Sequence, residues 1–92
     1  MITAQTKKPL GTARFERMRN VKYLAWEDVF EVEFDSGVTY LLSNRELRRR
    51  NRLRRAGAVE AVWVDPELRS GFFIRYDNGD TAEASWEVVK EA

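Results

Sequence analysis

The chain has 92 residues, of which 43% are hydrophobic and 34% charged, and its formal net charge at pH 7 is +1. This length suits one small domain, and the balance of acidic and basic residues excludes a general polyanion binder. The chain has neither Cys nor His, which excludes disulfides, thiolate or imidazole metal sites and His-dependent catalytic triads. We therefore expect no enzymatic activity, no cofactor and no metal site.

Residues 1–20 are expected to form a mobile N-terminal arm and lead-in. Thr, Gln, Lys, Pro and Gly mix over residues 1–11 without periodicity, while 14–20 could form either a short helix or a lead-in strand. The arm lacks the apolar segment of a signal peptide, and no apolar run approaches the roughly 18–20 residues that span a bilayer. A small domain without cysteines favours a reducing compartment. The sequence thus predicts a cytoplasmic protein without a membrane partner.

The plan of the stretch 29–47 is repeated by 71–89. Each stretch has an alternating apolar strand, a Gly-containing hairpin turn, a return strand and a Ser that opens a helix. Residues 21–92 are therefore predicted to form one α+β domain of two half-repeats, 21–57 and 58–92, related by a pseudo-twofold axis. Each half has the order β-β-β-α, and the hairpins make the sheet mainly antiparallel, with about six strands and two helices in all.

In the first half, branched and aromatic residues between turn signals predict strands over 21–26, 29–34 and 38–42. Ser43 and Glu46 match a capping box, in which the Ser oxygen accepts an early backbone N–H, so a helix should begin there. We expect this helix to continue through the following arginines and to end near Gly57, with Asn51 as a candidate interruption.

In the second half, the same reasoning predicts strands over 59–64, 72–76 and 81–84. Asn78-Gly79 is the strongest hairpin signal of the chain, and Ser85 should cap a short terminal helix. The connection 65–70 is longer than its counterpart 27–28, which is the main difference between the halves.

The candidate binding surface is a run of seven arginines from Arg45 to Arg55, whose formal charge is +6 once Glu46 is subtracted. On a helix, i, i+3 and i+4 spacing would place Arg45, Arg48, Arg49 and Arg52 in a stripe on one face. Guanidinium groups offer forked donors that suit both carboxylates and phosphates. The residues predicted to bind a partner are Arg45, Arg48, Arg49, Arg52 and Arg55.

Three interpretations of this run stay open. The first is a small non-enzymatic binding or adaptor protein that presents an arginine-rich helix to an acidic protein partner. The second is a sequence-tolerant nucleic-acid binder that uses the same arginines, whose affinity would fall steeply with salt. No ribonucleoprotein-type aromatic signature accompanies the run. In the third, the arginines form a solvated face and pair internally with acids such as Glu31, Glu33 and Asp35.

Large aromatic residues in a small domain usually fill the core, which predicts structural roles for Trp26, Trp63 and Trp86. Phe73 falls on the face of its strand opposite the apolar side. Together with Leu41 and Val64 it predicts an apolar patch on the second sheet face. We expect a helix to cover most of this patch, with a homodimer as the alternative.

Several segments resemble a known family, namely Asp35-Ser36-Gly37, Val62-Trp63-Val64-Asp65 and Ile74-Arg75-Tyr76-Asp77-Asn78-Gly79. Over residues 21–92 the chain resembles small bacterial proteins of the domain of unknown function 2442 family. Those proteins have an F-x-x-G hairpin, a V-x-V-D segment and a W-x-N-G hairpin, and Tyr76 stands here in place of the Trp. The resemblance implies a small partner protein, and some family members are suspected antitoxin components.

A second similarity is to the N-terminal domain of gamma-butyrobetaine hydroxylase-like proteins. It depends on Leu47-Arg48 after a hairpin and on the later Ser85-Trp86. That domain typically binds zinc through Cys and His, which this chain lacks, so the similarity implies no zinc site here.

Overall fold

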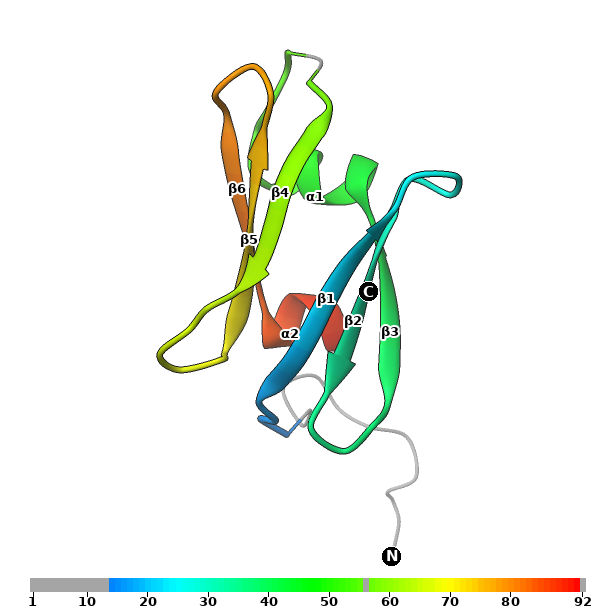
Figure 1. Ribbon diagram of the computed structural model, residues 1–92, viewed down its shortest axis with the longest axis vertical. Helices are drawn as coiled ribbons and strands as arrows, with labels where there is room; N and C mark the ends of the chain where they lie inside the picture. Colours follow the sequence, from blue (N-terminus) through cyan, green and yellow to red (C-terminus); the bar gives the residue numbers. More distant parts are fainter. Residues whose placement is uncertain (1–13, 56, 92) are drawn as a thin grey trace, which may run out of the picture.

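The structure, a computed structural model, describes residues 14–55 and 57–91 (Figure 1). It contains two three-stranded antiparallel sheets, each followed by a short helix. The first half consists of β1 (Met18–Leu24), β2 (Val29–Phe34), β3 (Thr39–Ser43) and α1 (Asn44–Arg50). The second half consists of β4 (Val59–Val64), β5 (Gly71–Tyr76), β6 (Thr81–Ser85) and α2 (Trp86–Glu91). The predicted α+β fold with a repeated β-β-β-α unit is confirmed.

The repeat extends to individual hydrogen bonds. The Asn44 N–H donates to the Asp28 carbonyl at 3.0 Å, and the Trp86 N–H donates to the Ser70 carbonyl at 2.8 Å. Both bonds join the start of a helix to the connection between the first two strands of its own half. The two connections therefore hold their helices in the same way despite their different lengths.

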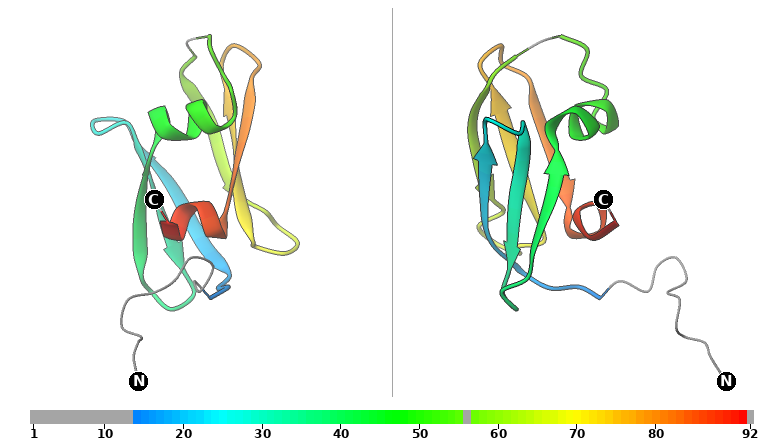
Figure 2. Two further views of the ribbon diagram at one scale, coloured as in Figure 1. Left: turned by 180° about the vertical axis from the view of Figure 1, so that it is seen from behind. Right: turned by 90° about the vertical axis from the view of Figure 1, so that its right-hand side faces the viewer.

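The two sheets enclose one core between them. β1 and β4 lie side by side along one edge, and both helices bridge β3 and β6 along the opposite edge (Figure 2). Side chains alternate along the strands, so one face of each sheet points inward. The Phe30 and Phe72 rings, one from each central strand, meet there at 5.5 Å. The other large, fully buried side chains include Phe34, Met18, Leu42, Leu47, Ile74, Val32 and Val89.

The first strand begins earlier than predicted. Met18 is fully buried, and its N–H donates to the Arg69 carbonyl at 2.8 Å, so part of the expected lead-in belongs to β1. The strand also ends at Leu24, before the predicted end at residue 26, because the chain turns over residues 25–28. The expectation of a mobile arm falls mainly on residues 1–13, which lie outside the described residues.

The arginine-rich helix is much shorter than predicted, since α1 ends at Arg50. The Arg52 N–H donates to the Arg49 carbonyl at 3.1 Å, and the Leu53 N–H donates to the Arg48 carbonyl at 2.9 Å. This pair of bonds is a Schellman motif, in which the residue after the C-cap is left-handed and usually Gly. Here that residue is Arg52, with φ of 59°.

A tertiary contact explains why the helix stops. Asn51 is the C-cap, and its side-chain amide donates to the Leu47 carbonyl at 2.9 Å and to the Glu83 carbonyl at 3.1 Å. Its Oδ1 accepts from the Glu83 N–H at 3.2 Å. These bonds hold Asn51 against β6, so the chain cannot continue as a helix towards Gly57. The predicted extension of the helix beyond residue 50 is wrong.

Candidate functional site

The first turn of α1 fixes where its arginines lie. The Ser43 Oγ accepts the Glu46 N–H at 2.9 Å, as the capping box predicts. Asn44 and Leu47 are the buried residues of this helix, which places their side against the core. The side chains of Arg45 and Arg49 are exposed. Short as it is, α1 is amphipathic and presents cations to solvent.

The five predicted site residues do not share one helical face. Arg45, Arg48 and Arg49 lie on α1, whereas Arg52 and Arg55 lie in the segment between α1 and β4. The predicted stripe that included Arg52 is therefore wrong, because the chain leaves the helix one residue before it. The arginines instead form a surface of a helix and a loop at one end of the molecule (Figure 1).

Glu46 neutralises part of the helical charge. Its carboxylate accepts two bonds from the Arg49 guanidinium, at 3.1 and 2.5 Å, and one from Arg50 Nε at 3.1 Å. The bond from Arg49 is the main reason that the pKa of Glu46 lies below its usual value. The same contact raises the pKa of Arg49. Exposed pairs of this kind contribute little stability, but they orient the two guanidinium groups.

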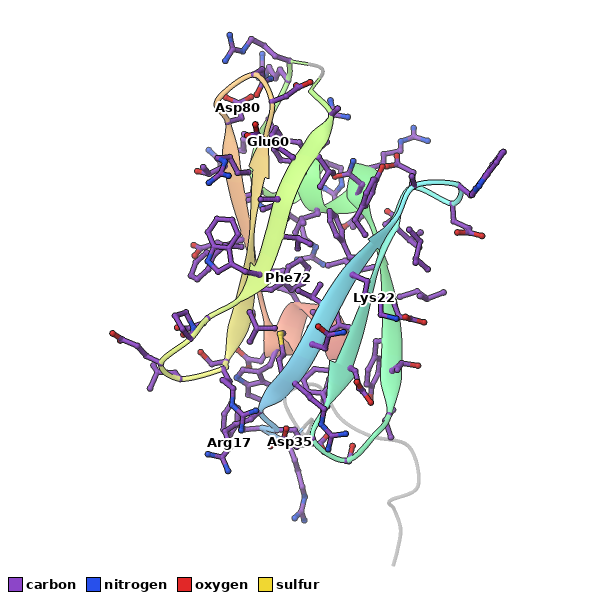
Figure 3. The ribbon with its side chains drawn as sticks, in the orientation of Figure 1. Arg17, Lys22, Asp35, Glu60, Phe72 and Asp80 are labelled. Carbon is purple, nitrogen blue, oxygen red and sulfur yellow. The ribbon has the colours of Figure 1, made fainter. Side chains whose placement is uncertain are left out.

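The arginines after α1 are tied to the second half. Arg48 donates to the Arg55 carbonyl at 3.2 Å, and Arg55 in turn donates to the Asp80 carboxylate at 3.3 Å. Asp80 follows the β5–β6 turn, at the same end of the molecule as α1 (Figure 3). This chain of contacts fixes the position of the loop that carries the remaining arginines.

The internal pairing considered for the third interpretation does not occur with the acids named. Asp35 accepts two bonds from Arg69, at 3.3 and 3.2 Å, and lies 3.7 Å from both Arg17 and Arg19. Glu33 lies 3.6 Å from Arg19. Asp35 is at the opposite end of the molecule from Asp80 and the arginine loop (Figure 3).

Three arginines of the run have no side-chain partner in the described structure. Within residues 14–55 and 57–91, no hydrogen bond or ion pair involves the side chain of Arg45, Arg52 or Arg54. All three are exposed. Arg54 was not among the predicted site residues, although it belongs to the same run. Among the described residues of the run, these three guanidinium groups are not engaged internally.

Trp26 is the functional candidate that sequence reasoning missed. It was expected to be structural, but its side chain is 98% exposed in the turn between β1 and β2. The prediction failed because the chain leaves the strand after Leu24, and a Trp beyond the last paired residue has no sheet face to pack on. The signal available was its position directly before the turn residues Glu27 and Asp28.

Hydrogen bonds hold this turn rigidly against the start of α1. The Tyr23 hydroxyl and the Asn44 side-chain amide both donate to the same Asp28 oxygen, at 2.5 and 3.0 Å. The bond to Asp28 raises the pKa of Tyr23 to about 12. Trp26 is two residues from Asp28 and Arg45 follows Asn44, so these bonds hold the turn that carries Trp26 beside the start of α1, where Arg45 lies. We call Trp26, Arg45, Arg52 and Arg54 the Trp–Arg surface.

The other predicted aromatic features are distributed differently. Trp86 is partly buried and packs against the core, as expected for a structural residue. Trp63 is 40% exposed, with the Phe73 ring at 5.8 Å and the Arg75 guanidinium 5.9 Å above it. Leu41 lies on the other sheet, while Val64 packs against the core. The single apolar patch predicted from Phe73, Leu41 and Val64 is therefore wrong.

No group of three or more acidic side chains within the described chain is arranged to hold a metal ion. Likewise, the described residues include no helix that could cross a membrane. Comparison of the chain with protein-family models, with curated proteins and with solved structures gave no significant match.

Proposed function

We propose that this protein is a small, non-enzymatic binding or adaptor protein whose Trp–Arg surface docks on an acidic surface of a partner protein. The observation that carries the proposal is the 98% exposed Trp26, whose turn is bonded to the start of α1 beside Arg45. Arg45 is one of three arginines of the run whose side chains have no partner among the described residues. Trp and Arg are the residues that most often dominate the binding energy of protein interfaces. A Trp side chain fills an apolar pocket, while surrounding guanidinium groups pair with carboxylates.

The backbone at Arg52 supports the same proposal. A left-handed conformation costs a residue with a Cβ about 1–2 kcal/mol, so Gly would be more stable at this position. Arg52 has this conformation, with φ of 59°, and no side-chain partner within the described residues. Local strain of this kind clusters at functional sites. An external partner would account for an arginine that costs stability and whose guanidinium group has no hydrogen bond or ion pair within the described residues.

Protein is favoured over nucleic acid by the distribution of charge. A nucleic-acid binder usually has an uninterrupted basic stripe along which phosphates lie. Here Glu46 and Asp80 each pair with arginines of the run, and the whole chain carries only +1. A small partner protein is also what the resemblance to the domain of unknown function 2442 family implies. We include that family relation and a cytoplasmic location in the proposal.

The proposal is tested with two variants of equal charge change. Arg45→Glu with Arg52→Glu alters the Trp–Arg surface, whereas Arg14→Glu with Lys22→Glu alters exposed cations outside it. A protein captured from host lysate would be identified and purified, and its affinity for each form measured by calorimetry. We expect binding to be lost by the first variant and kept by the second. Equal binding by both variants would exclude this surface.

A gel shift addresses the nucleic-acid alternative. Duplex and single-stranded DNA and RNA would be tested at about 50 and about 200 mM salt, since phosphate contacts weaken steeply over this range. No shift at the lower salt concentration is expected. A shift that disappears in the variant Arg45→Glu with Arg52→Glu would instead assign these arginines to nucleic acid.

A further inference from the structure

The two sheets have four edge strands, and the described chain treats them differently. β1 and β4 face each other side by side without forming a common sheet (Figure 1). The edge of β6 is covered by Asn51, whose side-chain amide bonds both the N–H and the carbonyl of Glu83. The amide thus stands in for a neighbouring strand. Free sheet edges invite pairing with another chain, and such devices prevent it.

At the β3 edge, no side chain of the described residues binds the backbone in this way. The Phe34 N–H donates to the Val38 carbonyl at 3.0 Å, so these two residues form a hydrogen-bonded pair. From there, non-hydrogen-bonded and hydrogen-bonded pairs alternate along the β2–β3 hairpin. Leu41, opposite Glu31, is therefore in a non-hydrogen-bonded pair, so its N–H and carbonyl point away from β2. Neither group has a hydrogen-bond partner within the described chain. Leu41 has the same place in its half as Glu83 has in the other.

The sequence of β3 also lacks the charges that protect edges. Its residues are Thr39, Tyr40, Leu41, Leu42 and Ser43, whereas the edge strand β1 includes Arg19 and Lys22. The Leu41 side chain is 59% exposed on the outer face of its sheet. A short, uncharged edge with an exposed Leu at its centre is suited to pair with another uncharged strand.

We propose that a second copy of this chain pairs antiparallel with β3, centred on Leu41, to form a dimer with one continuous six-stranded sheet. In this arrangement the two Leu41 residues face each other across a twofold axis and exchange their N–H and carbonyl bonds. Their exposed side chains then meet on one face. The strand is self-complementary, because β3 itself has no charged side chain and each copy provides both an outward N–H donor and an outward carbonyl acceptor at Leu41.

Assembly through β3 stops at two copies. An isologous contact uses the same surface of both subunits, so the pairing consumes the β3 edge of each. Of the other edges, β1 and β4 face each other and Asn51 occupies the centre of β6. The proposal does not depend on the Trp–Arg surface, which includes no residue of β3.

Sedimentation equilibrium of the full chain tests the proposal. Wild type is expected to pass from monomer to dimer between about 1 and about 200 µM, because an interface of two short strands is small. Leu41→Lys places like charges at the twofold axis and should weaken dimerisation by about tenfold or more. Leu41→Pro removes the outward N–H but no hydrogen bond between β2 and β3, and it should weaken dimerisation to a similar extent.

Thr81→Lys is the matched control, since it adds the same charge at an exposed position of the other helix-side edge strand, β6. It should dimerise as wild type does. Circular dichroism of each variant shows whether its fold is kept, and the two Leu41 variants perturb the strand in different ways. A wild type that stays monomeric at the highest concentration overturns the proposal. So does a dimer that both Leu41 variants leave as strong as the Thr81→Lys control.

Discussion

The Tyr76 hydroxyl donates a hydrogen bond of 2.7 Å to the Asn44 Oδ1, and this buried contact joins the two halves of the molecule. Asn44 is 4% exposed and opens α1, while Tyr76 ends β5. Through its side-chain amide Asn44 also binds Asp28 in the β1–β2 turn. One buried amide thus connects the second half to the turn that carries Trp26. A polar bond of this kind requires a defined geometry, which apolar contacts between the sheets do not impose.

Tyr76→Phe should lower the free energy of unfolding by about 1–2 kcal/mol, because it leaves a buried Asn44 oxygen without its donor. Urea denaturation measures the change. Tyr40→Phe is the control, since the Tyr40 hydroxyl has no hydrogen-bond partner among the described residues. Equal midpoints for the two variants would show that the buried bond contributes nothing.

The raised pKa of Tyr23 should make the folded state less stable at alkaline pH. Its pKa is raised to about 12 by the hydrogen bond to Asp28, with burial as the second cause. The folded state therefore keeps a proton that the unfolded state loses from about pH 10, so stability falls as pH rises from about 10 to 12. Below pH 10 the contribution is complete. Tyr23→Phe lacks it at every pH.

The measurement compares urea midpoints of wild type and Tyr23→Phe across this range. The difference between the two proteins should be constant from neutral pH to about pH 9 and then shrink towards pH 12. Burial also raises the pKa of Tyr76, which likewise lowers the stability of the folded state at alkaline pH. Because Tyr76 is present in both proteins, its effect largely cancels in the difference between their midpoints. A difference that stays constant to pH 12 would contradict the assignment.

Arg52→Gly should stabilise the fold while weakening partner binding. Gly adopts the left-handed conformation of this position without a Cβ clash, and we expect a gain of about 0.5–1 kcal/mol in the free energy of unfolding. Arg54→Gly removes a similar side chain where the backbone is not left-handed, so it should not stabilise. Thermal unfolding of both variants separates the relief of backbone strain, which only Arg52→Gly provides, from the loss of a positive charge, which the two variants share. A destabilised Arg52→Gly would show that the arginine has a structural role.

The fold was predictable because its signals are local. Alternating residues define β2 and β5, and Asn78-Gly79 defines a hairpin, so both halves could be derived from short windows of sequence. The end of α1 was not predictable in this way. It depends on Asn51 reaching the backbone of Glu83, 32 residues further along the chain. Pattern and propensity cannot detect a contact of that range.

The candidate site was predictable only in part. The arginine run is visible in the sequence, but which guanidinium groups are free depends on Glu46 and on Asp80 from the other half. Trp26 has the composition of a core residue, and its exposure follows from where β1 ends. The packing of the two halves therefore determined that Arg55 is paired, and the end of β1 determined that Trp26 is exposed.

Asn51→Ala should change both stability and assembly. It removes the bonds to Leu47 and to both backbone groups of Glu83, and should cost about 1–3 kcal/mol. It also opens the β6 edge, so light scattering should detect species larger than those of wild type. Adding Leu41→Pro to this variant leaves one open edge and should limit growth again. Unchanged assembly in Asn51→Ala would show that the amide does not protect the edge.

Trp26→Ala should leave the free energy of unfolding within about 0.5 kcal/mol of wild type, because substitutions of fully exposed side chains seldom matter to stability. Trp26 is 98% exposed and Trp63 is 40% exposed, while Trp86 is partly buried, so acrylamide should quench mainly Trp26. The variant should lose that quenchable fraction of the fluorescence and keep its unfolding midpoint. A loss of more than about 1 kcal/mol would mean that Trp26 packs within the protein, since that is the scale of lost internal contacts. An unchanged unfolding midpoint would support the proposal that Trp26 contacts a partner.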